Sequence, residues 1–161
     1  MFVLRCTRKL LTRMGELPVD VAPGDSTTTL GDWYADGLFT VRNYVVLCVS
    51  EHARVPVIVP AREIRTLAAR LPAALAHVLS DLAIPSASIA RELTEMNDAQ
   101  FAKTASRSLL GTINDYAIEV TWALAEEPDL SLHRLSIRLS DTPIRPMNGE
   151  HPARVAKRLL G

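Results

Sequence analysis

The sequence predicts an α+β fold, in which a small antiparallel sheet made of an amino-terminal strand and a three-stranded meander packs against several carboxy-terminal helices. Two observations lead to this prediction. Short β-type runs are concentrated before residue 60, and after Pro60 the repeat of apolar residues lengthens from about two positions to about 3.6. The length of 161 residues suits one domain. We therefore expect residues 1–161 to form a single domain, with residues 1–60 mainly β with one short helix and residues 61–161 mainly α.

The chain opens with a predicted strand and a short helix. Residues 1–6 are rich in β-branched and aromatic side chains. Thr7 is expected to be the N-cap of a helix that ends at Gly15, because apolar residues between 10 and 14 recur at helical spacing and glycine commonly closes a helix. Residues 18–30 contain prolines and three consecutive threonines without any apolar period, so they predict a loop.

The meander is predicted from three β-type runs. Residues 38–41 and 44–50 flank Arg42 and Asn43, and asparagine tolerates the positive φ of a tight hairpin turn. The third run, residues 55–59, contains a proline at its second position, which has no N–H to donate. We therefore expect this run to start a strand or to lie at the edge of the sheet.

A long amphipathic stretch follows the meander. Apolar residues from 64 to 82 share one helical face, and Pro72 is expected to kink this helix or to divide it into two. Pro85 ends the stretch. Ser86 or Ser88 is then a candidate N-cap for the next helix.

The last part of the chain is also predicted to be mainly helical. Residues 100–105 suit a strand or an extended connector, and a long helix is expected to start at Ser106 or Ser108. Residues 130–139 fit either a helix or a strand, and the helix is preferred. A short terminal helix is expected over residues 153–160.

Composition and charge narrow the class of protein. Net charge is zero, with eighteen basic and eighteen acidic residues, so no global field attracts a polyanion, and nucleic acid is a possible partner that the overall charge does not indicate. Cys6 and Cys48 lie in apolar runs and are expected to be buried and reduced. There is no recognisable signal peptide and no apolar run that could span a bilayer, so we expect a cytoplasmic protein without a membrane partner.

Local basic charge gathers at both ends of the sequence. If the two groups met in space, they would form one basic face, whereas the alternative is scattered, solvated charges. The residues are Arg5, Arg8, Lys9 and Arg13 near the amino terminus, and Arg154, Lys157 and Arg158 in the predicted terminal helix.

The motifs of common catalytic and cofactor sites are missing from the sequence. The four histidines lack the spacing of metal ligands on one helix, the cysteines form no CxxC pair, and no G-x-S-x-G or phosphate-binding glycine loop is present. We therefore expect no metal and no cofactor.

The first candidate site is the junction between the first strand and the first helix. Arg5, Thr7 and Lys9 combine two cations with a capping residue, and helix-capping N–H groups beside cations can hold an anion. The alternative, which we prefer, is ordinary capping with exposed cations.

Two further clusters interrupt apolar elements with polar groups. Asp32, Trp33 and Tyr34 precede the predicted hairpin, and the two aromatic side chains must either anchor the core or form a binding surface, the core being preferred. Asn114 and Asp115 place an amide beside a carboxylate within a predicted helix.

Several of these motifs resemble an uncharacterised family of small bacterial proteins, known only as a domain of unknown function. The family opens with an Arg-Cys-Thr-x-Lys-Leu-Leu stretch and continues with Leu-Gly-x-Trp-Tyr-Ala-Asn, and it has later Gly-Ser-Met-Asn-Asp and Leu-x-x-Thr-Pro segments. The similar segments here are residues 4–11, 30–35, 110–115 and 139–143, and the differences fall at Asp36 and at Ser50–Glu51. The resemblance implies one domain and no particular activity.

The preferred functional hypothesis is a non-enzymatic binding or protein-interaction module. Its recognition surface is expected near Trp33, Tyr34 and residues 5–9, and its partner is another protein or a second copy of the chain. This hypothesis rests on the missing catalytic motifs.

The alternative is a small enzyme that acts on a phosphate-bearing or nucleic-acid substrate. Arg5 and Lys9 would bind the anion, and Asp32, Glu51 or Asp115 would be the general base. This hypothesis requires residues far apart in the sequence to converge.

Overall fold

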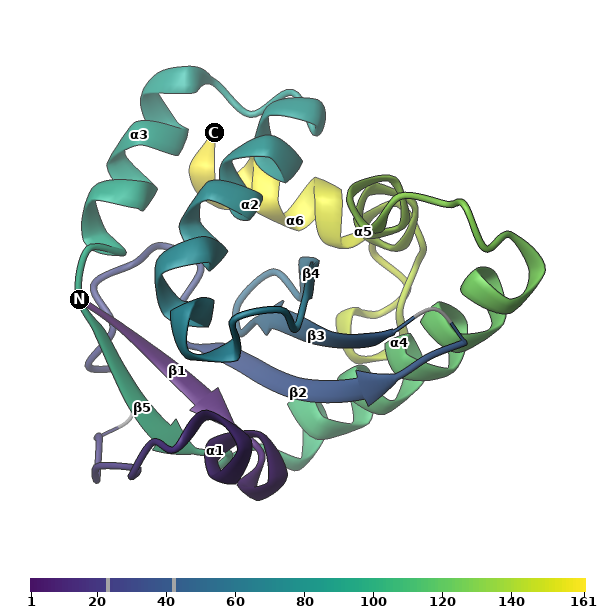
Figure 1. Ribbon diagram of the computed structural model, residues 1–161. Coiled ribbons are helices and arrows are strands. Elements are labelled where there is room, and N and C mark those ends of the chain that lie inside the picture. The colour runs from purple at the N-terminus through teal and green to yellow at the C-terminus, as the bar shows by residue number, and fades with distance from the viewer. Residues whose placement is uncertain (23, 42) are drawn as a thin grey trace.

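The computed structural model describes residues 1–22, 24–41 and 43–161, and its centre is a mixed five-stranded sheet (Figure 1). The predicted α+β class is confirmed. The strands lie in the order β4-β3-β2-β1-β5. Their bounds are β1 Phe2–Cys6, β2 Trp33–Phe39, β3 Tyr44–Ser50, β4 Pro56–Pro60 and β5 Ala99–Lys103.

Helices cover both faces of the sheet. Short 3₁₀ turns lie at Ile64–Thr66 and Arg145–Met147. In the part of the chain that the structure describes, no helix has the length and apolar character needed to cross a membrane. The α-helices are α1 Arg8–Met14, α2 Leu67–Asp81, α3 Ser86–Glu95, α4 Arg107–Glu126, α5 Leu132–Ser140 and α6 Pro152–Leu160.

Most helix boundaries agree with the predictions. Gly15 closes α1 with a φ of 73°, Ser106 caps α4 through its side chain, and the predicted helices near residues 130–139 and 153–160 are α5 and α6. Two details differ. Pro72 lies inside the single helix α2, so a division there is wrong, and Pro85 occupies the capping position expected for a serine.

The amino-terminal strand lies inside the sheet and not at its edge. β1 pairs in parallel with β2 and with β5, while β2, β3 and β4 form the predicted antiparallel meander. β2 starts at Trp33, earlier than predicted, because residues 33–35 pair with β1. The predicted turn at Arg42 and Asn43 lies partly outside the described residues.

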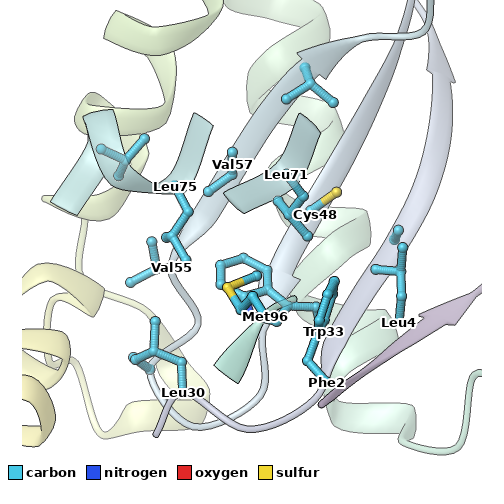
Figure 2. Close-up of a cluster of buried hydrophobic side chains, with 14 of the residues drawn as sticks. Phe2, Leu4, Leu30, Trp33, Cys48, Val55, Val57, Leu71, Leu75 and Met96 are labelled. Atoms are coloured by element: carbon cyan, nitrogen blue, oxygen red, sulfur yellow. The ribbon is translucent and has the colours of Figure 1, made fainter. Parts of the chain in front are cut away.

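Side chains alternate along the strands between the two faces of the sheet, and each face has its own hydrophobic core. Trp33 and Leu4 point to one face, where α2 contributes Leu71 and Leu75, and Figure 2 shows these side chains together with Cys48. The other face packs against α4, which lies on the far side of the sheet from α2 in Figure 1, and against residues of α5, which also contacts α2 beside β4. The members of this second core include Tyr34, Val45, Leu47, Val49 and Ile58 from the sheet and Leu109, Ile113, Tyr116, Val120 and Leu124 from α4.

The outer side of β4 offers no free N–H to another strand. Ile58 donates its N–H to Ser136 Oγ of α5, at 3.0 Å. The backbone N–H groups at the even-numbered positions of β4 therefore point away from β3. The other two outward positions are Pro56 and Pro60, which have no N–H. Prolines on an edge strand are a recognised protection against strand-to-strand association, and here Ser136 completes it.

The opposite edge is covered by the segment that follows α1. Val19 donates its N–H to the carbonyl of Phe101 in β5, at 2.9 Å. The loop predicted over residues 18–30 is therefore bound to the sheet over part of its length.

Replacement of Ser136 by alanine tests the protection of β4. In Ser136→Ala the buried N–H of Ile58 loses its partner, so we expect the free energy of unfolding to fall by about 1–3 kcal/mol. Urea denaturation followed by circular dichroism measures this change. The matched control is Ser80→Ala on the exposed side of α2, which should alter stability by less than about 0.5 kcal/mol. Equal midpoints for both variants would contradict a role for this bond.

Candidate functional site

A buried ion pair joins the first two strands. Arg5 lies on β1 next to Tyr34 in the parallel register, and Asp32 immediately precedes β2 on the same face of the sheet. Arg5 Nε lies 2.6 Å from Asp32 Oδ2, and the two side chains are only 7% and 3% exposed. A pair removed from water in this way is stable only when its remaining polar atoms are also bonded.

Two further N–H groups of Arg5 bind backbone carbonyls. Nη1 donates to Lys103 at the end of β5, at 3.0 Å, and Nη2 donates to Val21 in the segment after α1, at 3.4 Å. Beside the guanidinium is a hollow of about 450 Å³, lined by residues 18–22 and 102–105. Arg5 thus links three strands and a loop, and Asp32 balances its charge.

Asp32 is equally well satisfied. Its second oxygen accepts from Ser26 Oγ, at 2.6 Å, and Ser26 Oγ in turn accepts from the N–H of Val3. The backbone N–H of Asp32 donates to Glu51 Oε2, at 3.0 Å. These bonds account for the ordered path of the segment before β2. They also occupy both carboxylate oxygens that a general base would need.

Thr7 and Lys9 serve different purposes. Thr7 occupies the N-cap position of α1, but its Oγ1 donates to Asp36 Oδ1 at 2.6 Å and makes no bond to the helix. Asp36 Oδ1 also accepts from the N–H of Gly37. Lys9 is exposed and forms no ion pair among the described residues.

The two adjacent aromatic residues anchor the two cores. Trp33 is fully buried in the first core, as preferred from the sequence, and its Nε1 has no hydrogen-bond partner among the described residues (Figure 2). Tyr34 is 2% exposed and faces α4. Burial raises the pKa of its hydroxyl. Neither ring lies on the surface, so neither is available for direct recognition in this conformation.

Asn114 and Asp115 lie apart from the ion pair. Both are on the exposed side of α4, and neither lines the hollow beside Arg5. The buried polar contact of α4 is instead with Arg54, whose guanidinium donates to Thr112 Oγ1 at 2.9 Å and whose desolvation lowers its pKa. No local spacing in the sequence signals this contact, because the two residues are 58 positions apart.

The sequence prediction did not identify an apolar stripe on the outer side of α4. Ile118 and Trp122 are 59% and 67% exposed, one helical turn apart. Beside them, α4 and α5 form a hollow of about 340 Å³ that Leu135 and Leu139 also line. Trp122 falls outside the inward-facing pattern of α4, and this was the signal available in the sequence. We call Asp115, Ile118, Glu119, Trp122 and Glu126 the α4 stripe.

A second hollow lies beside β4, between α2 and α5. Its volume is about 620 Å³, and its lining includes His77, Asp81 and His133. His133 Nε2 lies 2.6 Å from Asp81 Oδ2. The rings of His77 and His133 are arranged edge to face, with their centroids 6.4 Å apart. The nearby Ser136 hydroxyl donates to the Leu132 carbonyl and accepts from β4, so it is not poised as a nucleophile for His133.

The described residues include no cluster of metal ligands, and both cysteines are buried. Among the described residues, no group of three His, Cys, Asp or Glu side chains is arranged to hold a metal ion. Cys6 and Cys48 are free and buried on the same face of the sheet. Burial raises the pKa of both thiols, that of Cys48 to about 12.

Removal of one partner of the buried ion pair should be more harmful than removal of both. In Asp32→Ala the Arg5 charge stays buried without a counterion, and we expect a loss of about 3–5 kcal/mol in the free energy of unfolding. A double variant, Arg5→Leu with Asp32→Leu, should lose less than either matched single variant, Arg5→Leu or Asp32→Leu. Asp25→Ala, in the exposed part of the same loop, is the control. Additive losses in denaturant unfolding would show that the pair is not coupled.

The buried thiols make stability sensitive to alkaline pH. Because their pKa values are raised in the folded state, they stay protonated there, whereas those of the unfolded chain ionise above about pH 8.5. The free energy of unfolding should be fully retained below that pH and fall by about 2 kcal/mol per thiol by pH 10. Urea unfolding at pH 7, 8.5 and 10 measures the slope. Cys48→Ala should reduce the loss between pH 8.5 and 10, and an unchanged slope would rule out this origin.

Comparison with known proteins yields one match. A family model described as a domain of unknown function, DUF6933, matches residues 3–155. No curated protein and no solved structure matches the chain. The match spans most of the strands and helices described above. The chain therefore belongs to the DUF6933 family.

Proposed function

We propose that this protein is a cytoplasmic, non-enzymatic binding module that recognises a basic, partly apolar segment of another protein through the α4 stripe. The observation that supports this most directly is the exposure of Trp122, at 67% of its surface. Tryptophan is costly to leave in water and is among the residues most enriched at the energetic centres of protein interfaces.

The surroundings of Trp122 support a binding surface and not an isolated exposed ring. Ile118 lies one turn earlier on the same side of α4, and the buried side chains of Leu135 and Leu139 form part of the wall of the hollow between α4 and α5. An apolar patch bordered by polar side chains is typical of a protein-interaction site. An apolar side chain of a partner can enter the hollow beside Trp122.

The charge of the α4 stripe favours a basic partner. Asp115, Glu119 and Glu126 border the apolar side chains, and α4 has no lysine or arginine after Arg107. The one cation that lines the hollow among the described residues, Arg138 of α5, lies 3.6 Å from Glu127 and is balanced by it. A second copy of the chain would bring the same acidic stripe against itself in a two-fold interface, and like charges in contact oppose association. A separate basic segment meets no such repulsion.

The placement of the other candidate residues favours binding over the enzyme alternative. Arg5 and Asp32 neutralise each other, and both oxygens of Asp32 already accept hydrogen bonds. Asp115 lies on the exposed side of α4. The two free, buried cysteines agree with a reducing, cytoplasmic location.

Substitution of Trp122 tests the proposal. Partners captured from an extract of the source cells are identified by mass spectrometry, and the basic segment of each is synthesised for titration calorimetry. Trp122→Ala should weaken binding by roughly 30-fold or more, because it removes about 2 kcal/mol or more at the centre of the interface. Glu119→Lys should also weaken binding, since it reverses a charge in the stripe.

The matched control is Leu159→Ala, another exposed apolar residue, on α6, which should leave the affinity unchanged. Size-exclusion chromatography with light scattering should show a monomer. Undiminished binding by Trp122→Ala would refute the proposal. So would a dimer that Trp122→Ala dissociates, because the stripe would then be covered by a second copy.

A further inference from the structure

Two aromatic rings lie together where β2 ends and β3 begins, and one of them is exposed. Phe39 and Tyr44 are partners in the β2–β3 register, their ring centroids are 4.5 Å apart, and Phe39 is 71% exposed. The Tyr44 ring lies across Gly37, where even one additional carbon would overlap its hydroxyl. Glycine at position 37 thus lets the ring lie close against the strand.

A cation stacks on these rings. The guanidinium carbon of Arg13, in the last turn of α1, lies 4.2 Å from the Tyr44 ring centroid and 5.4 Å from that of Phe39. Such contacts hold the guanidinium near the rings, where Tyr44 is also its hydrogen-bond partner, and they leave its other N–H donors for an anion. Arg13 can therefore still bind an anion from this position.

Two more cations line the same hollow, whose volume is about 850 Å³. Arg8 and Lys9 of α1 join Arg13, and no acidic residue contributes to the lining. Neither Arg8 nor Lys9 makes an ion pair among the described residues. The nearby Asp36 is engaged by Thr7 and by the backbone.

The basic surface continues across the ends of the strands. An adjoining hollow of about 590 Å³ shares Arg8 and Thr12 and reaches Lys103 at the end of β5, with Glu16 as its acidic member. The path from Tyr44 to Lys103 crosses the ends of β3, β2, β1 and β5. Three spacings between neighbouring strands, together with the four residues by which Phe39 extends beyond Ala35, give a length of about 19 Å. We call Arg8, Lys9, Arg13, Phe39, Tyr44 and Lys103 the α1 surface.

We propose that the α1 surface binds single-stranded nucleic acid, with a base stacked on the exposed ring of Phe39 and phosphates held by the cations. Cations alone would hold any polyanion, but an exposed ring beside them adds a platform for the flat face of an unpaired base. Paired bases are already stacked and do not present that face. Because the net charge of the protein is zero, the attraction is local and should be strongly weakened by salt.

The test is fluorescence anisotropy with fluorescein-labelled 12-nucleotide strands of oligo-U and oligo-dT at several salt concentrations. For three or four phosphate contacts, the logarithm of the binding constant should fall with the logarithm of salt with a slope of about −2 to −3. Phe39→Leu keeps the apolar bulk but removes the ring, and it should weaken binding roughly 5- to 100-fold. Phe39→Trp should retain the affinity. Arg8→Gln should make the salt slope shallower by about 0.7.

Controls separate this site from general charge and from the α4 stripe. Arg154→Gln, an exposed charge on α6, and Trp122→Ala should both leave strand binding unchanged. Heparin has no bases, so it should bind the wild type and Phe39→Leu equally. All substituted side chains are exposed, and circular dichroism checks that each variant folds.

Three results would overturn the proposal. The first is no binding of either strand at low salt. The second is equal strand affinity for the wild type and Phe39→Leu, which would leave only a surface for polyanions. The third is binding of uridine monophosphate as tight as that of the 12-nucleotide strand, which would indicate a mononucleotide site.

Discussion

The buried ion pair between Arg5 and Asp32 is the contact on which the arrangement of the amino-terminal half depends. Its hydrogen bonds reach β5 and the segment after α1, so it fixes the order in which β2, β1 and β5 lie side by side. A buried pair of this kind adds little net stability compared with apolar side chains, but it penalises any register that leaves one charge alone. Its contribution is therefore to the uniqueness of the fold more than to its stability.

Much of the fold could be predicted from local patterns. The meander, the edge position of β4 and the helices α1, α5 and α6 follow from spacing, turn residues and prolines. Two features could not be predicted in this way. The parallel pairing of β1 with β5 joins segments almost one hundred positions apart, and no local pattern encodes it. Pro72 stays inside α2 because burial of Leu71 and Leu75 outweighs the lost hydrogen bond.

The candidate residues were harder to interpret than the elements that hold them. A sequence shows that Arg5 and Asp32 interrupt apolar surroundings, but not that they neutralise each other. Conversely, the side chains of Trp122 and Phe39 face solvent, and only the lack of neighbours that cover them distinguishes them from core residues. The histidine pair between α2 and α5 was hidden because its members come from different helices. Contacts between distant elements are the information that a single sequence does not hold.

The closed outer side of β4 has a consequence for synthesis of the chain. The serine that occupies the Ile58 N–H lies 78 residues further along the sequence, so the strand leaves the ribosome long before its protection exists. During that interval its one outward donor is open to other nascent chains, and only the flanking prolines limit such pairing. A truncated product that ends before α5 would keep this donor exposed permanently. The edge of the sheet that forms early is therefore protected only after α5 has been synthesised and has packed against β4.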